Sequence, residues 1–396
     1  MDIQLSDRAQ AIKPSPTLAV TNRAAELRAE GKDIIGLGAG EPDFDTPEHI
    51  KDAATKAIAA GYTKYTAVDG TPTLKKAIIE KFARDNQLEY QPNQILVSCG
   101  GKQSYFNMAL ALLNKGDEVI IPAPYWVSYP DMVTVAEGTP VIIETDATSR
   151  YKISAEQLDA AITPQTRLVT LNSPSNPSGM AYTKAELEAL AAVLMKHPNV
   201  LVATDDMYEH ILWTDESFNN ILTVCPELYE RTIVLNGVSK AYSMTGWRIG
   251  YAAGPAKLIG AMKKIQSQST SNPCSIAQHA AQAALEGPQE CVAEMVKAFK
   301  ERHDYVVNEL NNIEGVSCLA GDGTFYAFPD LSEAIAKRSD VNSDVDLAEK
   351  LLGEAGVAIV PGSAFGTPNH ARLSFATSME VLQEALTRLK KGIEGT

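Results

Sequence analysis

Lys240 and Arg248 stand eight residues apart in a segment of small and apolar side chains. Lysine is normally exposed, so these surroundings are unusual for it. Burial lowers the pKa of an amine, and a neutral amine is the nucleophile that forms a Schiff base with an aldehyde. The segment therefore predicts a covalent attachment site beside a second cation.

Four other short segments carry groups that could complete such a site. The sequence 100–102 (Gly-Gly-Lys) offers backbone amides for a phosphate, Trp126 an aromatic face, Asn176 an amide, and Asp205 with Tyr208 a carboxylate and a phenol. Taken singly, each has an ordinary structural explanation, such as a tight turn, a core aromatic or a helix N-cap. Together they match pyridoxal 5′-phosphate, which has a phosphate, an aromatic ring with a nitrogen, a phenolic oxygen and an aldehyde.

All five segments follow runs of apolar residues that are short, rich in β-branched side chains and bounded by turn residues, which predicts strands. The predicted strands are residues 95–98, 118–121, 141–143, 167–171, 200–203, 232–235 and 249–253. Helix signals alternate with them, including a start at Thr46-Pro47, another at Thr71-Pro72 and a capping box at Thr183. This alternation predicts an α/β fold with a mostly parallel sheet between helices. Ligands bind at the carboxyl ends of such strands, so the five segments are expected to meet.

The pattern changes after about residue 297 to a long helix, strand-like pieces at 316–319, 324–328, 357–360 and 371–375, and an amphipathic helix through Leu382, Ala385, Leu386 and Leu389. We predict a large cofactor-binding domain at 46–296 and a smaller α+β domain at 297–396. Residues 1–45 are predicted to join the smaller domain.

The composition narrows the classes of function. The 396 residues include 49 acidic and 35 basic side chains, a net charge of −14, which argues against binding to nucleic acid or to anionic membranes. Five widely spaced cysteines with no C-x-x-C pair predict neither a disulfide framework nor a metal site, and they favour a reducing compartment, the cytoplasm. No run of apolar residues is long enough for a signal peptide or a membrane span.

Segments 237–240 (Gly-Val-Ser-Lys) and 246–250 (Gly-Trp-Arg-Ile-Gly) closely resemble the pyridoxal-phosphate attachment signature of class I aminotransferases. Similar segments occur along nearly the whole chain, at 13–15, 38–44, 62–65, 100–103, 124–129 and 372–377. The nearest subgroup is the bacterial aspartate/prephenate aminotransferases. The resemblance implies a fold type I transferase, with a seven-stranded mostly parallel sheet between helices and a smaller α+β domain.

The resemblance also implies roles for residues around the cofactor ring. Lys240 would attach the cofactor and, once released, move a proton at the substrate α-carbon. Asp205 would pair with the ring nitrogen, and Asn176 and Tyr208 would hydrogen-bond the phenolic oxygen. Trp126 would stack on the ring.

For the phosphate, the resemblance implies Gly100, Gly101, Lys102, Ser239 and Arg248, together with Tyr65 from a second subunit. That contact implies a homodimer with shared active sites. Many relatives have a serine three residues before the attachment lysine, where this chain has Gly237, a loss of about one hydrogen bond or ~1 kcal/mol.

For the substrate, the resemblance implies that Arg372 binds the α-carboxylate with help from the Gly40 backbone. Trp126 and Asn176 would also contact the substrate. In this subgroup Lys13, Ser15, Thr17 and Lys102 match positions near the distal carboxylate of a dicarboxylic substrate, although Lys13 and Lys102 could equally be surface lysines.

The implied activity is ping-pong transamination between L-aspartate or L-glutamate and a 2-oxo acid, extending to conversion of prephenate to arogenate. Two alternatives stay open: a preference for aromatic or a broader range of amino acids, and another reaction of the same cofactor. The glycines at 36–40 suggest a dinucleotide site, but their spacing and Pro42 argue against it. A ligand-sensing regulator would need a DNA-binding module, for which the acidic chain offers no segment.

Overall fold

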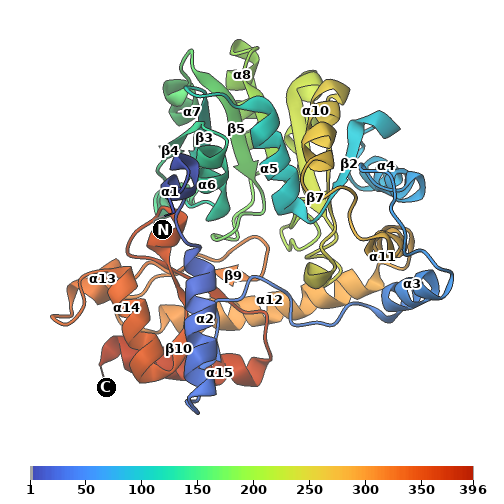
Figure 1. Ribbon diagram of the computed structural model, residues 1–396. Helices are drawn as coiled ribbons and strands as arrows, with labels where there is room; N and C mark the ends of the chain where they lie inside the picture. The colour runs from blue at the N-terminus through green and yellow to red at the C-terminus, as the bar shows by residue number, and fades with distance from the viewer. Residues whose placement is uncertain (1–2, 396) are drawn as a thin grey trace.

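A seven-stranded sheet forms the centre of the larger part of the molecule (Figure 1). The computed structural model describes residues 3–395. The strand order is β2-β8-β7-β6-β5-β3-β4, and β8 alone runs antiparallel to its neighbours. The strands are β2 (Ile95–Ser98), β3 (Glu118–Pro122), β4 (Thr139–Ile143), β5 (Thr166–Asn172), β6 (Leu201–Asp205), β7 (Thr232–Gly237) and β8 (Gly250–Ala253). The predicted mostly parallel sheet of seven strands is confirmed.

Helices cover both faces of this sheet. Successive residues of a strand point to opposite faces, and because both sets of side chains are apolar, both faces need to be buried. Ile95 and Val97 lie in one core and Leu96 in the other. The first core contains side chains of α3 (Glu48–Ala59), α4 (Pro72–Asn86), α7 (Ala155–Ala161), α8 (Lys184–Lys196), α9 (Ile221–Val224) and α11 (Ser275–Glu286). The second contains those of α5 (Gly101–Leu112), α6 (Ser128–Val135) and α10 (Ala256–Ser267).

Two of the three predicted helix starts are confirmed. The Thr71 hydroxyl accepts a hydrogen bond from the Leu74 amide, and Thr183 forms a capping box with Glu186. The prediction of Thr46 as an N-cap is wrong. Thr46 Oγ1 instead donates to the Ser243 carbonyl at 2.7 Å and accepts from Trp247 Nε1 at 2.9 Å, which joins the chain before α3 to the segment after Lys240.

The smaller part of the molecule has its own core, in which Phe299, Phe325, Phe375 and Leu386 pack together. It contains a sheet ordered β11-β12-β9 and a parallel pair, β1 with β10. The strands are β1 (Ile35–Gly36), β9 (Tyr326–Ala327), β10 (Val357–Ala358), β11 (Val360–Pro361) and β12 (Ala371–Ser374). The helices are α2 (Pro16–Ala29), α12 (Glu290–Asn311), α13 (Ser332–Ala336), α14 (Asp344–Lys350) and α15 (Met379–Glu394).

Two strand predictions in this region need correction. Residues 316–319 form no strand; Ser317 makes only an isolated bridge with Asp330. The piece predicted at 357–360 is divided between β10 and β11, which belong to different sheets. Val316, Cys318, Val357 and Val360 are buried, but burial does not determine strand partners.

The N-terminal segment contacts both parts of the molecule. β1 pairs with β10 of the smaller part, whereas α1 (Asp7–Ala11) lies near α6, with Arg8 Nη2 3.6 Å from Glu137 Oε1. The predicted boundary after residue 296 falls inside the continuous helix α12. We keep the domain bounds as a proposal. Within residues 3–395, no helix has the length and apolar character needed to span a membrane.

Candidate active site

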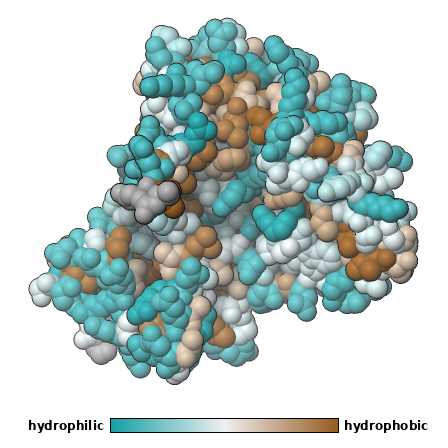
Figure 2. Space-filling view, in the orientation of Figure 1, coloured by the Kyte–Doolittle hydropathy of each residue, from teal (hydrophilic) through white to brown (hydrophobic). Residues whose placement is uncertain are grey.

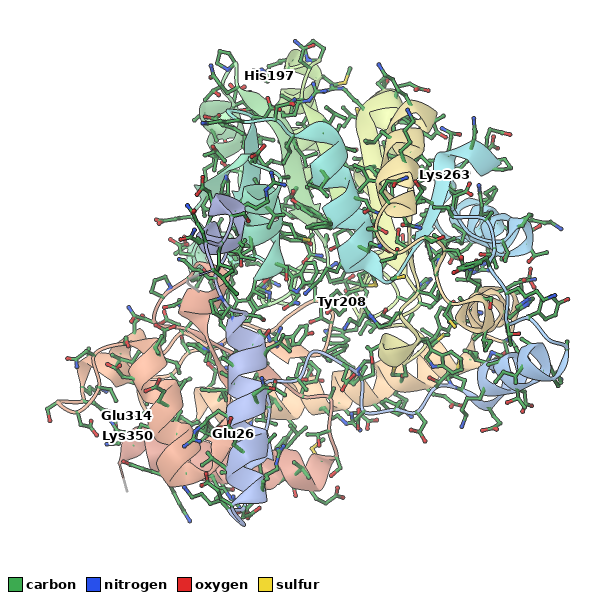
Figure 3. All side chains as sticks on the ribbon, viewed as in Figure 1. Glu26, His197, Tyr208, Lys263, Glu314 and Lys350 are labelled. Atoms are coloured by element: carbon green, nitrogen blue, oxygen red, sulfur yellow. The ribbon has the colours of Figure 1, made fainter. Side chains whose placement is uncertain are left out.

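A cavity of about 420 Å³ lies where the carboxyl ends of β5, β6 and β7 face the smaller part of the molecule. Figure 2 shows the surface hollowed there, and Tyr208 lies at the same central position in Figure 3. Most of the residues predicted for the site line the cavity: Thr17, Gly40, Gly101, Lys102, Trp126, Asn176, Asp205, Tyr208, Ser239, Lys240, Arg248 and Arg372.

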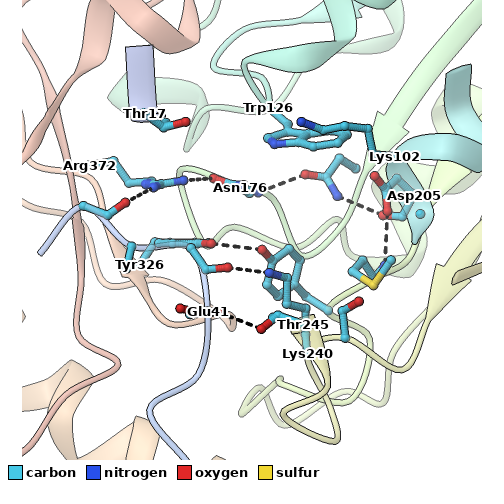
Figure 4. A pocket seen from close by; sticks show the side chains of 18 of the residues that line it. Thr17, Glu41, Lys102, Trp126, Asn176, Asp205, Lys240, Thr245, Tyr326 and Arg372 are labelled. Carbon is cyan, nitrogen blue, oxygen red and sulfur yellow. Dashed lines mark hydrogen bonds between the residues drawn. The ribbon is translucent and has the colours of Figure 1, made fainter. Parts of the chain in front are cut away.

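Lys240 follows β7, and its side chain enters the cavity (Figure 4). Its Nζ donates a hydrogen bond to the Gly40 carbonyl and lies 5.9 Å from the centre of the Tyr208 ring. Burial lowers the pKa of Lys240 to about 8, and the positive charges of Arg372 and Arg248 act in the same direction. The amine is therefore available in its neutral, nucleophilic form near neutral pH.

Asp205 is the last residue of β6 and supplies a carboxylate to the cavity. Tyr129 donates its hydroxyl to Asp205 Oδ2 at 2.5 Å, and the Met207 amide donates to Oδ1 at 3.3 Å. Asn172 Nδ2 fixes the Asp205 backbone carbonyl at 2.9 Å. Burial raises the pKa of Asp205, and these donors to the carboxylate oppose that rise. A cationic ring nitrogen is a suitable partner for this carboxylate.

The glycine turn before α5 forms a cradle for an anion. Gly100 is the N-cap with φ +88°, and the first amides of a helix have no carbonyl partner within it. A Cβ on Gly100 would lie 2.4 Å from Arg248 Nη2, and one on Gly101 would lie 2.6 Å from Met207 Cε. Arg248 donates to the Thr245 carbonyl at 2.8 Å, which keeps its guanidinium beside the turn. The donors therefore fit the phosphate of the expected cofactor.

Gly237 is explained by the contact between β7 and β8. It pairs with Gly250, and a Cβ at position 237 would lie 3.0 Å from Gly250 Cα and 3.1 Å from the Ile249 carbonyl oxygen. A side chain here would require the neighbouring backbone to move by a few tenths of an ångström, so the close pairing of β7 and β8 favours glycine at this position.

Arg372 lies on β12 and is only 3% exposed. It donates to Asn176 Oδ1 at 3.0 Å and to the Gly38 carbonyl at 2.7 Å. The guanidinium stacks 4.4 Å from the Tyr326 ring centre, and Tyr326 in turn contacts the Tyr208 hydroxyl at 3.1 Å. The buried Nε of Arg372 has no hydrogen-bond partner among the described residues, which leaves a donor for a carboxylate ligand.

Arg372 also affects how Asn176 can act. Because Asn176 Oδ1 accepts from Arg372, Asn176 would donate to a ligand through Nδ2. On the opposite side of the cavity, Lys102 Nζ lies 5.1 Å from the centre of the Trp126 ring. Partial desolvation, followed by the charge of Arg248, lowers the pKa of Lys102.

Four predicted residues lie outside the cavity lining. Lys13 is exposed, and Ser15 is the N-cap of α2, where its hydroxyl contacts Thr17 Oγ1 at 3.0 Å. Gly100 lies in the cradle behind Gly101, and Tyr65 is 92% exposed.

Several lining residues had no predicted role. Asn172 directly follows the predicted strand 167–171, and Tyr129 lies in the segment after the predicted strand 118–121. Both positions could have marked these residues as candidates. Tyr326 and Glu41 come from parts of the chain remote from those strand ends, and Glu41 Oε2 accepts from Thr245 at 2.7 Å. Glu41 lies in the segment 38–44 that resembles the family and Tyr326 in a predicted strand, but no pattern in the sequence assigns either side chain to the cavity. Among residues 3–395, no cluster of His, Cys, Asp and Glu could hold a metal ion.

Comparison with known proteins identifies the family. Residues 32–389 match the family model described as aminotransferase class I and II. The chain is 62% identical to the aspartate/prephenate aminotransferase of Nitrosomonas europaea, over 98% of this chain and 99% of the relative.

Two solved structures are closely similar. The aspartate aminotransferase of Rhizobium meliloti is 51% identical with a TM-score of 0.95, covering 99% of both chains. The Thermus thermophilus aspartate aminotransferase with maleate is 44% identical with a TM-score of 0.93, covering 99% of this chain and 100% of the other.

Proposed function

Because the chain belongs to the class I and II aminotransferases, which are pyridoxal-phosphate enzymes, we propose that it transaminates L-aspartate and L-glutamate with 2-oxo acids. We extend the proposal to prephenate as an acceptor, which would give arogenate. The name of the Nitrosomonas europaea relative supports L-aspartate and prephenate as substrates. The maleate in the Thermus thermophilus structure is a dicarboxylate, which supports the preference for acidic substrates.

The observation that carries the proposal is that Lys240, Asp205 and Arg372 line one cavity. The bound cofactor supplies an electron-accepting ring that stabilises negative charge at the substrate α-carbon. Lys240 would hold the cofactor covalently and then move the proton of that α-carbon, for which its lowered pKa is suited. Asp205 would keep the ring nitrogen protonated, and Arg372 would bind the α-carboxylate through its planar fork of donors.

The remaining donors divide between the phosphate and the distal carboxylate. The first turn of α5 and Arg248 would hold the phosphate. Lys102 and Thr17 line the same cavity and would face an acidic side chain. Lys13 and Ser15 lie close to Thr17 in sequence, and we retain them as residues that could approach the distal carboxylate when substrate is bound.

We further propose a homodimer in which Tyr65 reaches the phosphate site of the second subunit. Tyr65 is 92% exposed in its own subunit, so its ring and hydroxyl are free to contact a second one. A cytoplasmic location is supported by the cysteines, all five of which are free. Sedimentation should give a dimer, and a stable, fully active monomer would contradict the shared site.

The substrate proposal is tested with a panel of amino donors against oxaloacetate, 2-oxoglutarate and prephenate. L-Aspartate and L-glutamate are expected to bleach the visible absorbance of the bound cofactor and to give the highest kcat/KM. Lys240→Ala is the control, since it should fold and bind cofactor without turnover. A higher kcat/KM for an aromatic or a neutral amino donor would overturn the preference for acidic substrates.

A further inference from the structure

We propose that Tyr129 is a positioning residue that keeps the Asp205 carboxylate ionised and directed at the cofactor's ring nitrogen. The inference rests on the role proposed for Asp205. Tyr129 lies in the first turn of α6, and its hydroxyl donates to Asp205 Oδ2 at 2.5 Å. The two residues are 76 positions apart in the chain, so the contact depends on tertiary packing that brings the start of α6 to the end of β6.

Asp205 needs such a donor because its surroundings disfavour charge. Burial raises the pKa of this carboxyl group, and a protonated Asp205 could not pair with a cationic nitrogen. The backbone donor, Met207, reaches Oδ1 at 3.3 Å, whereas the phenol reaches Oδ2 at 2.5 Å. A short hydrogen bond from O–H to a carboxylate is among the stronger kinds, so Tyr129 makes the larger contribution.

The position of the Tyr129 hydroxyl is restricted on several sides. The side chain is 1% exposed, and its ring centre lies 4.8 Å from that of Tyr105 and 5.2 Å from that of Trp126, edge to face. One short segment, Trp126 to Tyr129, therefore supplies both the expected stacking residue and the donor to Asp205. Rotation of the phenol away from Oδ2 would disturb this packing.

Tyr105 provides a matched control within the same cluster. It is also 1% exposed and packs against Tyr129, but its hydroxyl contacts Thr170 Oγ1 at 2.8 Å and does not contact Asp205. Tyr105→Phe and Tyr129→Phe therefore remove the same group from equally buried rings. A general loss of packing or of a buried hydrogen bond would affect both variants, whereas only Tyr129→Phe would affect Asp205.

The experiment measures kcat and KM for L-aspartate, the Kd of pyridoxal phosphate for the apo-protein, and the pH midpoint of the bound cofactor's visible absorbance. In Tyr129→Phe we expect kcat to fall about 10- to 100-fold, with KM changed less than about threefold. The absorbance midpoint should move to higher pH, because a less protonated ring withdraws less charge from the attachment nitrogen. Tyr105→Phe should leave kcat and the midpoint near wild type.

A double-mutant cycle with Asp205→Asn separates the two proposals, using the midpoint and the Kd, which require no turnover. In the Asp205→Asn background, Tyr129→Phe should shift the midpoint little further. Equal effects of Tyr129→Phe and Tyr105→Phe, or fully additive effects in the cycle, would overturn the role of Tyr129. If Asp205→Asn itself leaves kcat and the midpoint unchanged, the site assignment under the proposed function fails instead.

A second substitution covers the case in which Tyr129→Phe folds poorly. Incorporating 3-fluorotyrosine at position 129 retains both the ring and the hydroxyl. This protein should keep a midpoint and a kcat within about threefold of wild type. A fluorotyrosine protein that folds but behaves like Tyr129→Phe would contradict the hydrogen-bonding role.

Discussion

Replacing Gly250 with alanine would place a methyl group where β8 touches the phosphate cradle. The new Cβ would lie 2.2 Å from the Gly101 nitrogen and 2.5 Å from the Gly100 carbonyl carbon. Both atoms belong to the backbone and cannot rotate away as a side chain can. Ordinary contact begins near 3.4 Å, so the turn has to move by about 1 Å.

A shift of this size would break phosphate contacts, because a hydrogen bond of about 2.9 Å would lengthen beyond its useful range. A hydrogen bond to a charged group contributes about 1.5–3 kcal/mol. Loss of one or two of them weakens cofactor binding by about 2–5 kcal/mol, roughly 30- to 5,000-fold in Kd. The effect should be specific to the phosphate, since β7 separates Gly250 on β8 from Asp205 on β6.

The assay titrates apo-protein with pyridoxal phosphate and, separately, with pyridoxal, which has the same aldehyde but no phosphate. Gly250→Ala should weaken only the phosphorylated ligand. Gly260→Ala is the control, because this exposed glycine of α10 has open space around its Cβ, and alanine there should stabilise the helix by about 0.5–1 kcal/mol. Normal affinity for pyridoxal phosphate, or an equal loss for both ligands, would refute the reasoning.

Three further predictions concern charged groups. Because the pKa of Lys240 is lowered from 10.5 to about 8, the rate at which the cofactor attaches to apo-protein, measured by trapping with borohydride, should reach half its maximum near pH 8. A midpoint near pH 10.5 would contradict the argument that burial lowers this pKa. Arg372→Lys keeps the positive charge but loses the planar guanidinium, so KM for L-aspartate should rise at least about tenfold while the cofactor absorbance stays normal. An unchanged KM would mean that the substrate α-carboxylate binds elsewhere. Lys81 is fully buried and donates a hydrogen bond to Glu209. Lys81→Met leaves that carboxylate with only the Asn86 and Asn236 amides and the more distant His210, and should lower the free energy of unfolding in urea by about 3–5 kcal/mol; a loss below about 1 kcal/mol would show that these remaining groups are sufficient for Glu209.

Sequence patterns were sufficient to predict the strands of the large sheet and the segments that follow them. This was possible because burial of alternate side chains and helix capping depend on residues close together in the chain. Lys240, Asp205 and Gly101 each come at or just after a predicted strand, so a general rule about sheet edges places them together. The short strands of the smaller part were predicted less well, since their partners come from distant segments.

The contacts between groups far apart in the chain became known from the folded structure. Arg372 meets Gly38 across 334 positions, Thr46 contacts Ser243 instead of capping α3, and Tyr129 reaches Asp205. Each contact depends on how one element packs on another, and no local pattern specifies that packing. The same holds for the charge of −14, because a sum over the chain carries no information about where the cations gather. Folding brings Lys102, Lys240, Arg248 and Arg372 to one cavity, which makes an acidic protein locally positive where anions would bind.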